Sequence, residues 1–129
     1  MKPWIRSLTI LRQNKVLSLL GLATRGHNLV SGEFQTENAV KSGCAMLVIV
    51  AEDASANTKK FFTDKSSYYG VPICQYGTKE ILGGAIGKEQ RSSLAVCDAG
   101  LAQAVMRALE GEGVCQVKGG SEHGKNEGT

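Results

Sequence analysis

The residues whose types and spacing best suit a binding function lie in segment 31–43, which reads SGEFQTENAVKSG. On a helix, Phe34 has Glu37 and Asn38 as its neighbours one turn along, and a Phe with polar neighbours is expected to stay partly exposed. The start of a helix offers free backbone N–H groups and a positive dipole end, which suit phosphate. An exposed aromatic ring beside them can stack on an unpaired base. The alternative is that Phe34 packs under the preceding helix or loop.

A second polar segment, residues 87–91, reads GKEQR and lies between a predicted helix and a predicted strand. Its two cations, Lys88 and Arg91, suit contacts with phosphate, which position a nucleic acid without reading its sequence. A loop that only faces solvent is the other interpretation. A third segment, Glu52-Asp53, follows an apolar run and suits a metal ion. Such a pair more often caps the next helix, and we expect capping here.

Known catalytic patterns fit this chain poorly. Residues 82–89, LGGAIGKE, faintly resemble a P-loop, but Leu82 stands at the first required Gly and Glu89 at the Ser/Thr that follows the Lys. His27 lies in a predicted loop and His123 near the C-terminus. No nucleophile–base pair or metal cluster can be assembled from the sequence. We therefore expect a non-enzymatic protein with no cofactor and no metal ion.

The length of 129 residues and the hydrophobic content of 42% fit one domain with a real core. The longest apolar run, residues 45–51, is far too short to span a membrane, and Arg6 and Arg12 interrupt any secretory signal core. We expect a cytoplasmic protein. The net charge is +3, but residues 1–50 carry +4, from six Lys/Arg against two Glu. The N-terminal third therefore favours an anionic partner.

The four cysteines are spaced roughly 20 to 30 residues apart, without a C-x-x-C motif or a nearby His pair. Three of them, Cys44, Cys74 and Cys97, lie in or beside apolar runs, and the fourth is Cys115. We expect buried free thiols rather than disulfides or metal ligands.

Helical and strand patterns alternate along the chain. The expected elements are, in order, a helix from 14 to 23, a strand at 29–30, a helix at 33–42, a strand at 45–50, a helix from 53 or 55 to 69, a strand at 73–76, a helix at 78–86, a strand at 93–97 and a helix from 98 to 109. The helix that ends at 69 is expected to pack on the core through one stripe of its surface. This stripe is made of Ala54, Thr58, Phe61, Phe62, Lys65, Tyr68 and Tyr69.

Helices between short apolar strands predict an α/β protein, built as a three-layer α/β/α sandwich. Residues 14–110 form the expected domain. Residues 1–13 are expected to be an N-terminal helical extension, and residues 111–129, rich in Gly and charge, a disordered tail.

Three runs together resemble the seven-Ae/thirty-e family of ribosomal proteins, and within it the small YlxQ-type proteins of Gram-positive bacteria. These runs are SGEFQTENAVKSG, LVIVAEDASANTKK and YYGVPICQYGTKEILGGAIGKEQRSSLAV, and the resemblance covers roughly residues 14–110. It implies a sandwich around a central mixed four-stranded sheet, and binding of kink-turn RNA.

Members of this family open the second helix with Gly-x-Asn-Glu-x-x-Lys. The Asn, Glu and Lys of that run read the sheared G·A pairs and nearby phosphates of a kink-turn. In this chain Gly32 matches, but Phe34, Gln35 and Asn38 stand at the Asn, Glu and Lys positions. The family also presses apolar side chains from the loop before the last strand onto flipped-out bases. This chain is polar there, with Lys and Gln at the expected apolar positions of segment 87–91.

The resulting hypothesis is a non-enzymatic, ribosomal-protein-like RNA-binding protein. It would bind structured, kink-turn-like RNA such as rRNA, in a ribosome or translation context that includes protein partners, with no membrane and no small-molecule substrate. The alternative is a protein-interaction module on the same scaffold, with RNA reading largely lost. The candidate RNA-binding residues are Gly32, Glu33, Phe34, Gln35, Asn38, Arg25, Lys41, Lys88, Glu89, Gln90 and Arg91.

Overall fold

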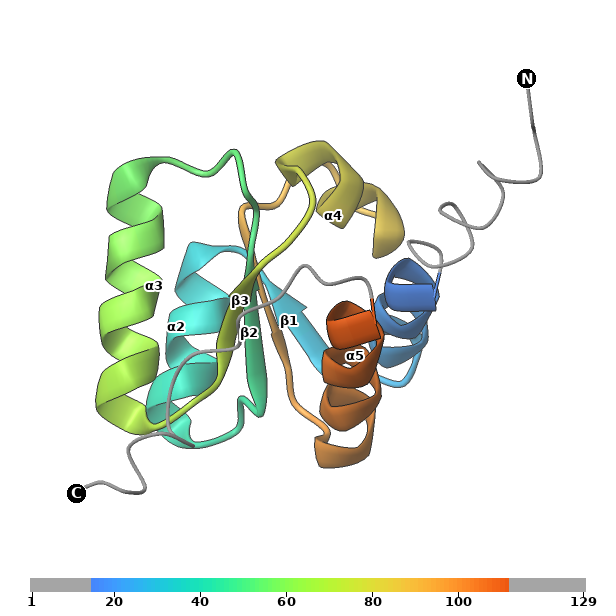
Figure 1. The fold of residues 1–129 in the computed structure, drawn as a ribbon, viewed down its shortest axis with the longest axis horizontal. Helices are drawn as coiled ribbons and strands as arrows, with labels where there is room; N and C mark the ends of the chain where they lie inside the picture. The colour runs from blue at the N-terminus through green and yellow to red at the C-terminus, as the bar shows by residue number, and fades with distance from the viewer. Residues whose placement is uncertain (1–14, 112–129) are drawn as a thin grey trace.

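The computed structural model describes residues 15–111, so the predicted N-terminal extension and nearly all of the predicted tail lie outside the described residues. The elements follow in the order of a first helix over 15–25, β1 (Leu29–Ser31), α2 (Glu33–Ser42), β2 (Leu47–Val50), α3 (Ala56–Tyr69), β3 (Ile73–Gln75), α4 (Lys79–Ala85), β4 (Ser93–Val96) and α5 (Ala99–Gly111) (Figure 1). Within the described range, no helix combines the length and the apolar character needed to cross a bilayer.

The four strands form one mixed sheet in the order β1-β4-β2-β3. β4 is antiparallel to both of its neighbours, with Ala95 opposite Val30 on one side and Val48 on the other, whereas β2 and β3 are parallel. α2 and α3 cover one face of the sheet, and the first helix and α5 cover the other (Figure 1). The predicted α/β/α sandwich with a mixed four-stranded sheet is confirmed.

The core lies on both faces of the two central strands. Every residue of β2 and β4 is buried, which explains why β2 and the last three residues of β4 read as continuous apolar runs rather than alternating ones. Three of the helices add a buried stripe to this core. These stripes are Val16, Leu20 and Ala23 on the first helix, Thr36, Ala39 and Val40 on α2, and Ala102, Val105 and Leu109 on α5.

The start of α3 decides between the two predicted caps. The hydroxyl of Ser55 accepts a hydrogen bond from the backbone N–H of Thr58 across 3.1 Å, so Ser55 is the N-cap. Asp53 instead accepts from the backbone N–H of Lys79 across 2.8 Å. The prediction that Glu52-Asp53 caps the next helix is therefore wrong, because Asp53 satisfies the first turn of α4. It ties the β2–α3 connection to that helix.

The predicted stripe of α3 is wrong at its C-terminal end. Phe62 and Ser66, four residues apart, are buried on the side that faces the sheet. Because successive residues turn by about 100° around a helix, Tyr68 points away from that side. Tyr68 is 81% exposed and Tyr69 is 42% exposed. Small Ser66 therefore occupies the buried position, and the two aromatic rings face solvent.

The cysteine prediction is confirmed in part. Cys44, Cys74 and Cys97 form no disulfide, as expected, and Cys115 lies outside the described residues. Cys74 is buried and Cys97 is half-buried, but Cys44 is exposed. The reason is its place in the chain: Cys44 follows Gly43, the left-handed residue that ends α2, and lies on the connection to β2.

A close approach shapes the C-terminal end of α4. A Cβ built on Gly83 would overlap the backbone carbonyl of Glu89, because segment 87–91 folds back against the helix. The backbone N–H of Lys88 donates to the Gly83 carbonyl across 2.8 Å. Position 83 thus requires glycine for space, and this glycine sets the path of the loop.

We expect Gly83→Ala to lower the free energy of unfolding by about 1–3 kcal/mol, the usual cost of forcing atoms into a packed site. Gly84→Ala is the matched control, because it lies in the same helix and its Cβ would meet nothing within 4 Å. The control should be neutral or stabilise by up to ~1 kcal/mol, the gain in helix propensity. Urea denaturation measures both, and equal stabilities would contradict the close approach.

Candidate functional site

The start of α2 is an open helix N-terminus. Its N-cap, Gly32, has φ 92° and ψ 156° and offers no side chain to the helix. The first intrahelical bond runs from the N–H of Thr36 to the carbonyl of Gly32 across 2.9 Å. The N–H groups of Glu33, Phe34 and Gln35 precede that bond and have no acceptor within the helix. They leave partial positive charge at this end of α2, which suits an anionic group.

The side chains around this helix start face solvent. Phe34 is 71% exposed, which confirms the predicted exposure and contradicts the alternative of packing under the preceding helix or loop. Glu33, Gln35 and Asn38 are exposed as well. Asn38 lies one helical turn beyond Phe34 and shares its side of α2.

The second predicted segment lies against the first. The Nε of Arg91 donates to the hydroxyl of Ser31 across 3.1 Å, and the backbone N–H of Gly32 donates to the carbonyl of Ser93 across 3.0 Å. These two bonds join Ser31 and Gly32, which lead into α2, to the end of the α4–β4 loop. We call the combined region the α2/loop surface. It comprises residues 32–35, Asn38 and residues 87–91.

Within the loop, the predicted residues differ in exposure. Lys88, Glu89 and Gln90 are exposed, whereas Arg91 is half-buried. Besides its bond to Ser31, Arg91 donates to the carbonyl of Gln90 across 2.9 Å. The main contact of Arg91 in the structure is therefore structural: its side chain connects the loop to the start of α2. Ser31 was missing from the predicted site, since nothing in the sequence signals a contact between residues 60 positions apart.

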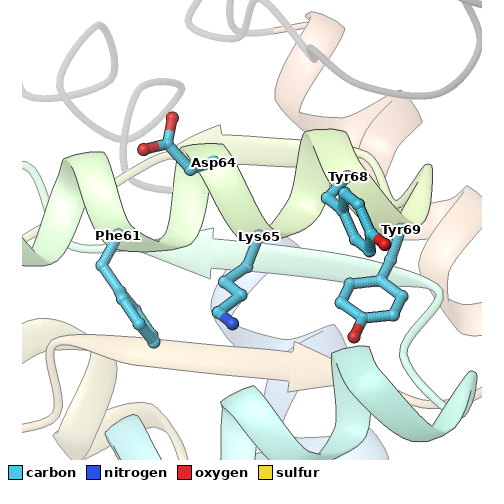
Figure 2. A pocket seen from close by; sticks show the side chains of 5 residues that line it. All are labelled: Phe61, Asp64, Lys65, Tyr68 and Tyr69. Atoms are coloured by element: carbon cyan, nitrogen blue, oxygen red, sulfur yellow. The ribbon is translucent and has the colours of Figure 1, made fainter.

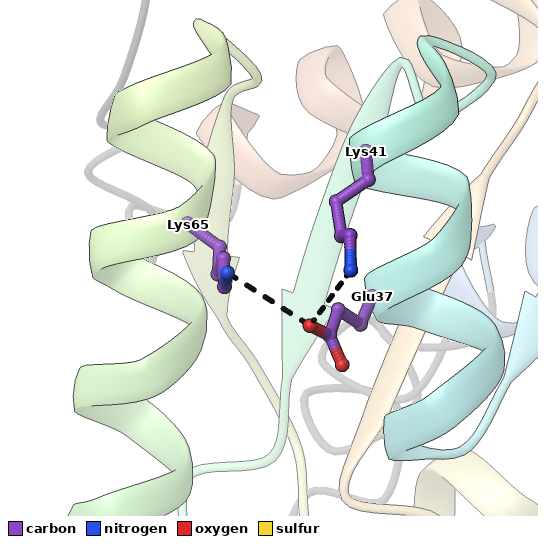
Figure 3. Close-up of polar contacts among 3 residues, drawn as sticks. All are labelled: Glu37, Lys41 and Lys65. Carbon is purple, nitrogen blue, oxygen red and sulfur yellow. Dashed lines mark hydrogen bonds and ion pairs between the residues drawn. The ribbon is translucent and has the colours of Figure 1, made fainter.

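Lys41 lies away from the α2/loop surface, in the last turn of α2. Its Nζ lies 3.5 Å from Glu37, and the same carboxylate oxygen lies 3.8 Å from the Nζ of Lys65 on α3 (Figure 3). The group bridges α2 and α3. Lys41 therefore faces α3 and is engaged there, and the structure does not bring it together with Phe34 and Gln35.

Arg25 is the last residue of the first helix, ahead of β1. A Cβ built on Gly21 would lie 3.9 Å from an Arg25 guanidinium nitrogen and 3.2 Å from the carbonyl oxygen of Ala85. The Arg25 side chain thus folds back along its own helix beside Gly21, where that helix approaches the last residue of α4. It adds positive charge next to the helix that leads into the α4–β4 loop.

The charge of the α2/loop surface is mixed. Exposed Glu33 and Glu89 alternate with Lys88 and Arg91 on the same two segments. The surface therefore suits an anion held by backbone N–H groups and one or two cations, rather than by a strong net charge. Among the residues that the structure describes, no group of three or more His, Cys, Asp or Glu side chains could hold a metal ion.

A second feature lies on α3 and shares no residue with the α2/loop surface. An open groove of about 450 Å³ is lined by Phe61, Asp64, Lys65, Tyr68 and Tyr69 (Figure 2). The two tyrosine rings meet edge to face, with centroids 4.9 Å apart. The Nζ of Lys65 lies 5.6 Å from the centroid of the Phe61 ring. The sequence pattern missed this groove because it assigned both tyrosines to the buried stripe.

We expect Gly32→Ala to cost about 1–3 kcal/mol of unfolding free energy, because its φ and ψ lie in a region that essentially only glycine visits. Gly43→Ala is the matched control, with φ 84° and ψ 5°. A residue in this left-handed region should cost about 1–2 kcal/mol. A Cβ at either position would meet nothing within 4 Å, so the difference reports backbone strain alone. Thermal unfolding measures it, and a larger loss for Gly43→Ala would contradict this expectation.

Comparison with known proteins places this fold and sequence in a family. The model of the ribosomal protein L7Ae/L30e/S12e/Gadd45 family matches residues 14–106. Among solved structures, that of a Bacillus halodurans protein matches with a TM-score of 0.72 and 42% identity, covering 74% of this chain and 97% of that one. The Giardia lamblia 15.5kD RNA binding protein matches with a TM-score of 0.67, over 78% of this chain and 86% of that one. The identity to this second protein is 21%, so the comparison shows a shared fold only.

Two relatives match over most of their length, and both are named RNA-binding protein YlxQ. The Bacillus subtilis (strain 168) protein is 44% identical over 92 residues, which are 71% of this chain and 92% of that protein. The Enterococcus faecium protein is 38% identical over 99 residues, 77% of this chain and 95% of that protein. The chain therefore belongs to the ribosomal protein L7Ae/L30e/S12e/Gadd45 family, as a YlxQ-type member.

Proposed function

We propose that this chain is an RNA-binding protein whose α2/loop surface binds structured, kink-turn-like RNA in a ribosome or translation context. One observation carries the proposal: the open N-terminus of α2, with Phe34 71% exposed, lies directly against the polar loop that ends at Arg91. Backbone donors, an exposed ring and cations are the groups that bind structured or unpaired RNA. The name RNA-binding protein, carried by both YlxQ relatives, supports the same function.

In this proposal each group has a separate role. The N–H groups of residues 33–35 hold a phosphate at the positive end of α2. The ring of Phe34 stacks on an unpaired base, and the amide of Gln35 donates and accepts at a base edge. Lys88 contacts a second phosphate from the loop. Arg91, half-buried, keeps the loop in place against Ser31 and presents the rest of its guanidinium to RNA.

The alternative, a protein-interaction module on the same scaffold, also has one observation in its favour. The groove on α3 exposes Tyr68 and Tyr69, and exposed tyrosines are common at protein interfaces. We rank this function second because the α2/loop surface has an open set of backbone donors that the aromatic groove on α3 lacks. Under the alternative, partner binding would survive nuclease treatment and vary little with salt.

The test is a gel-shift titration at fixed salt with three RNAs: a kink-turn, the same RNA with its G·A pairs replaced, and a plain duplex. We expect the intact kink-turn to bind most tightly, because only it presents an unpaired base next to a sharply bent backbone. Equal, weak binding to all three would contradict the kink-turn proposal. No binding to any RNA, together with nuclease-resistant capture of a protein, would favour the alternative.

In the same titration, Phe34→Ala should weaken kink-turn binding roughly tenfold to a hundredfold, the loss of ~1–3 kcal/mol of base stacking. Tyr68→Ala is the matched control, because it also removes an exposed aromatic ring from a helix surface, at 81% exposure. The control should leave the affinity unchanged. If Tyr68→Ala weakens binding and Phe34→Ala does not, the RNA lies on α3 and the proposed surface is wrong.

Salt dependence tests the role of Lys88. Each phosphate contact that a cation makes releases counterions, so Lys88→Gln should reduce the slope of log Kobs against log salt by about 1. Lys60→Gln is the control: Lys60 is exposed on α3 and pairs with Asp64 across 3.1 Å, away from the α2/loop surface. Its slope should match that of the parent chain. An unchanged slope for Lys88→Gln would remove this residue from the phosphate contacts.

A further inference from the structure

Two cysteine side chains from distant parts of the chain meet at one end of the sheet. The thiol of Cys97, which follows β4, lies close enough to the side chain of Cys44, which follows α2, for the two to interact. The Sγ of Cys97 also lies 4.0 Å from the carbonyl oxygen of Ala95. Both thiols are free. Neither belongs to the α2/loop surface, and the function proposed above does not use them.

The backbone holds both cysteines in place. β2 and β4 are antiparallel, with Leu47 opposite Val96, and the backbone N–H of Met46 extends the pairing by donating to the Val96 carbonyl across 2.7 Å. This brings the segment before β2 alongside the segment after β4. The N–H of Cys44 donates to Ala39 across 3.0 Å, within the C-cap of α2.

Cys97 is held in the same way, by a 2.7 Å hydrogen bond from its N–H to the carbonyl of Asn28. The backbone of both cysteines is therefore fixed by hydrogen bonds at the same end of the sheet. A disulfide requires its two cysteines to lie side by side, and the pairing of β2 with β4 brings these two segments together.

The environments of the two thiols differ. Burial, and to a smaller extent the neighbouring Cys44 side chain, raises the pKa of the Cys97 thiol to about 12. Cys97 therefore stays protonated at neutral pH. Cys44 is exposed, so it is the sulfur that a reagent in solution reaches first.

We propose that Cys44 and Cys97 form a thiol modification site that closes to a reversible intrachain disulfide when a peroxide oxidises it. The sulfur of Cys44 attacks the peroxide O–O bond, which breaks, and gives a sulfenic acid and one water. The sulfur of Cys97 then displaces the hydroxyl group of that sulfenic acid, and its thiol proton leaves with the hydroxyl as a second water. Overall, two thiols lose two electrons and two protons, and one hydrogen peroxide becomes two waters.

The disulfide would connect the end of α2 to the end of β4. α2 runs from Glu33 to Ser42, about 15 Å along its axis at the usual rise per residue. The pair thus lies at the opposite end of α2 from Gly32. Closure would join two connections that the RNA proposed above does not touch.

The experiment treats the full chain with hydrogen peroxide under native conditions and then blocks the remaining thiols. We expect intact-mass analysis to show the loss of two hydrogens, non-reducing peptide mapping to join Cys44 to Cys97, and dithiothreitol to restore both thiols. Cys44→Ser and Cys97→Ser should each abolish this linkage. Cys115→Ser, which changes a cysteine outside the described residues, should leave it intact.

Other results would overturn the proposal. A disulfide that joins either cysteine to Cys115 or Cys74 would show that the preferred partner lies elsewhere. Oxidation of Cys44 to a sulfinic acid, while Cys97 remains a thiol that the blocking reagent labels, would show that the two sulfur atoms do not combine. Each substitution is conservative in size and Cys44 is exposed, so the folded variants can be compared directly with the parent chain by circular dichroism.

Discussion

The pairing of β4 with two antiparallel neighbours is the constraint on which the rest of the structure depends. β4 lies between β1 and β2, and every one of its residues is buried. β4 runs antiparallel to both neighbours. The N-terminal end of β4 therefore lies beside the C-terminal end of β1, and the C-terminal end of β4 lies beside the N-terminal end of β2. The first junction places Arg91 against Ser31 and creates the α2/loop surface. The last junction brings the segment that holds Cys44 alongside the segment that holds Cys97.

Backbone conformation, more than side-chain chemistry, shapes the α2/loop surface. Gly32 has a φ of 92°, which turns the chain from β1 into α2 and leaves the first N–H groups of the helix open. Gly83 lets segment 87–91 approach α4 closely. These two glycines define where the surface lies, and the exposed side chains between them are free to differ. The same scaffold can therefore carry Phe34 and Gln35 where the family pattern has Asn and Glu.

Local features were predictable from the sequence, and long-range contacts were not. The bounds of α2 follow from its apolar positions and from Gly43, and the exposure of Phe34 follows from its polar neighbours, because both depend on residues within one helical turn. The cap role of Asp53 and the link between Arg91 and Ser31 depend on residues 26 and 60 positions apart, which no local pattern reports. Tyr69 was assigned to the buried stripe because aromatic residues at helical spacing usually pack inward. Here small Ser66 takes the buried position instead.

The charge of the α2/loop surface limits how the RNA binding proposed for it could work. Asn38 stands where the family pattern has a Lys, so one cation is missing from the helix, while Glu33 and Glu89 add negative charge nearby. In the proposed complex, long-range attraction to a phosphate backbone would therefore be weak, and affinity would come from short-range contacts. A helix N-terminus and an exposed ring act only at contact distance, and both are independent of net charge. A surface of this kind should distinguish RNAs by whether they can offer an unpaired base and a phosphate together, which makes the shape of the RNA, rather than its charge, the basis of selection.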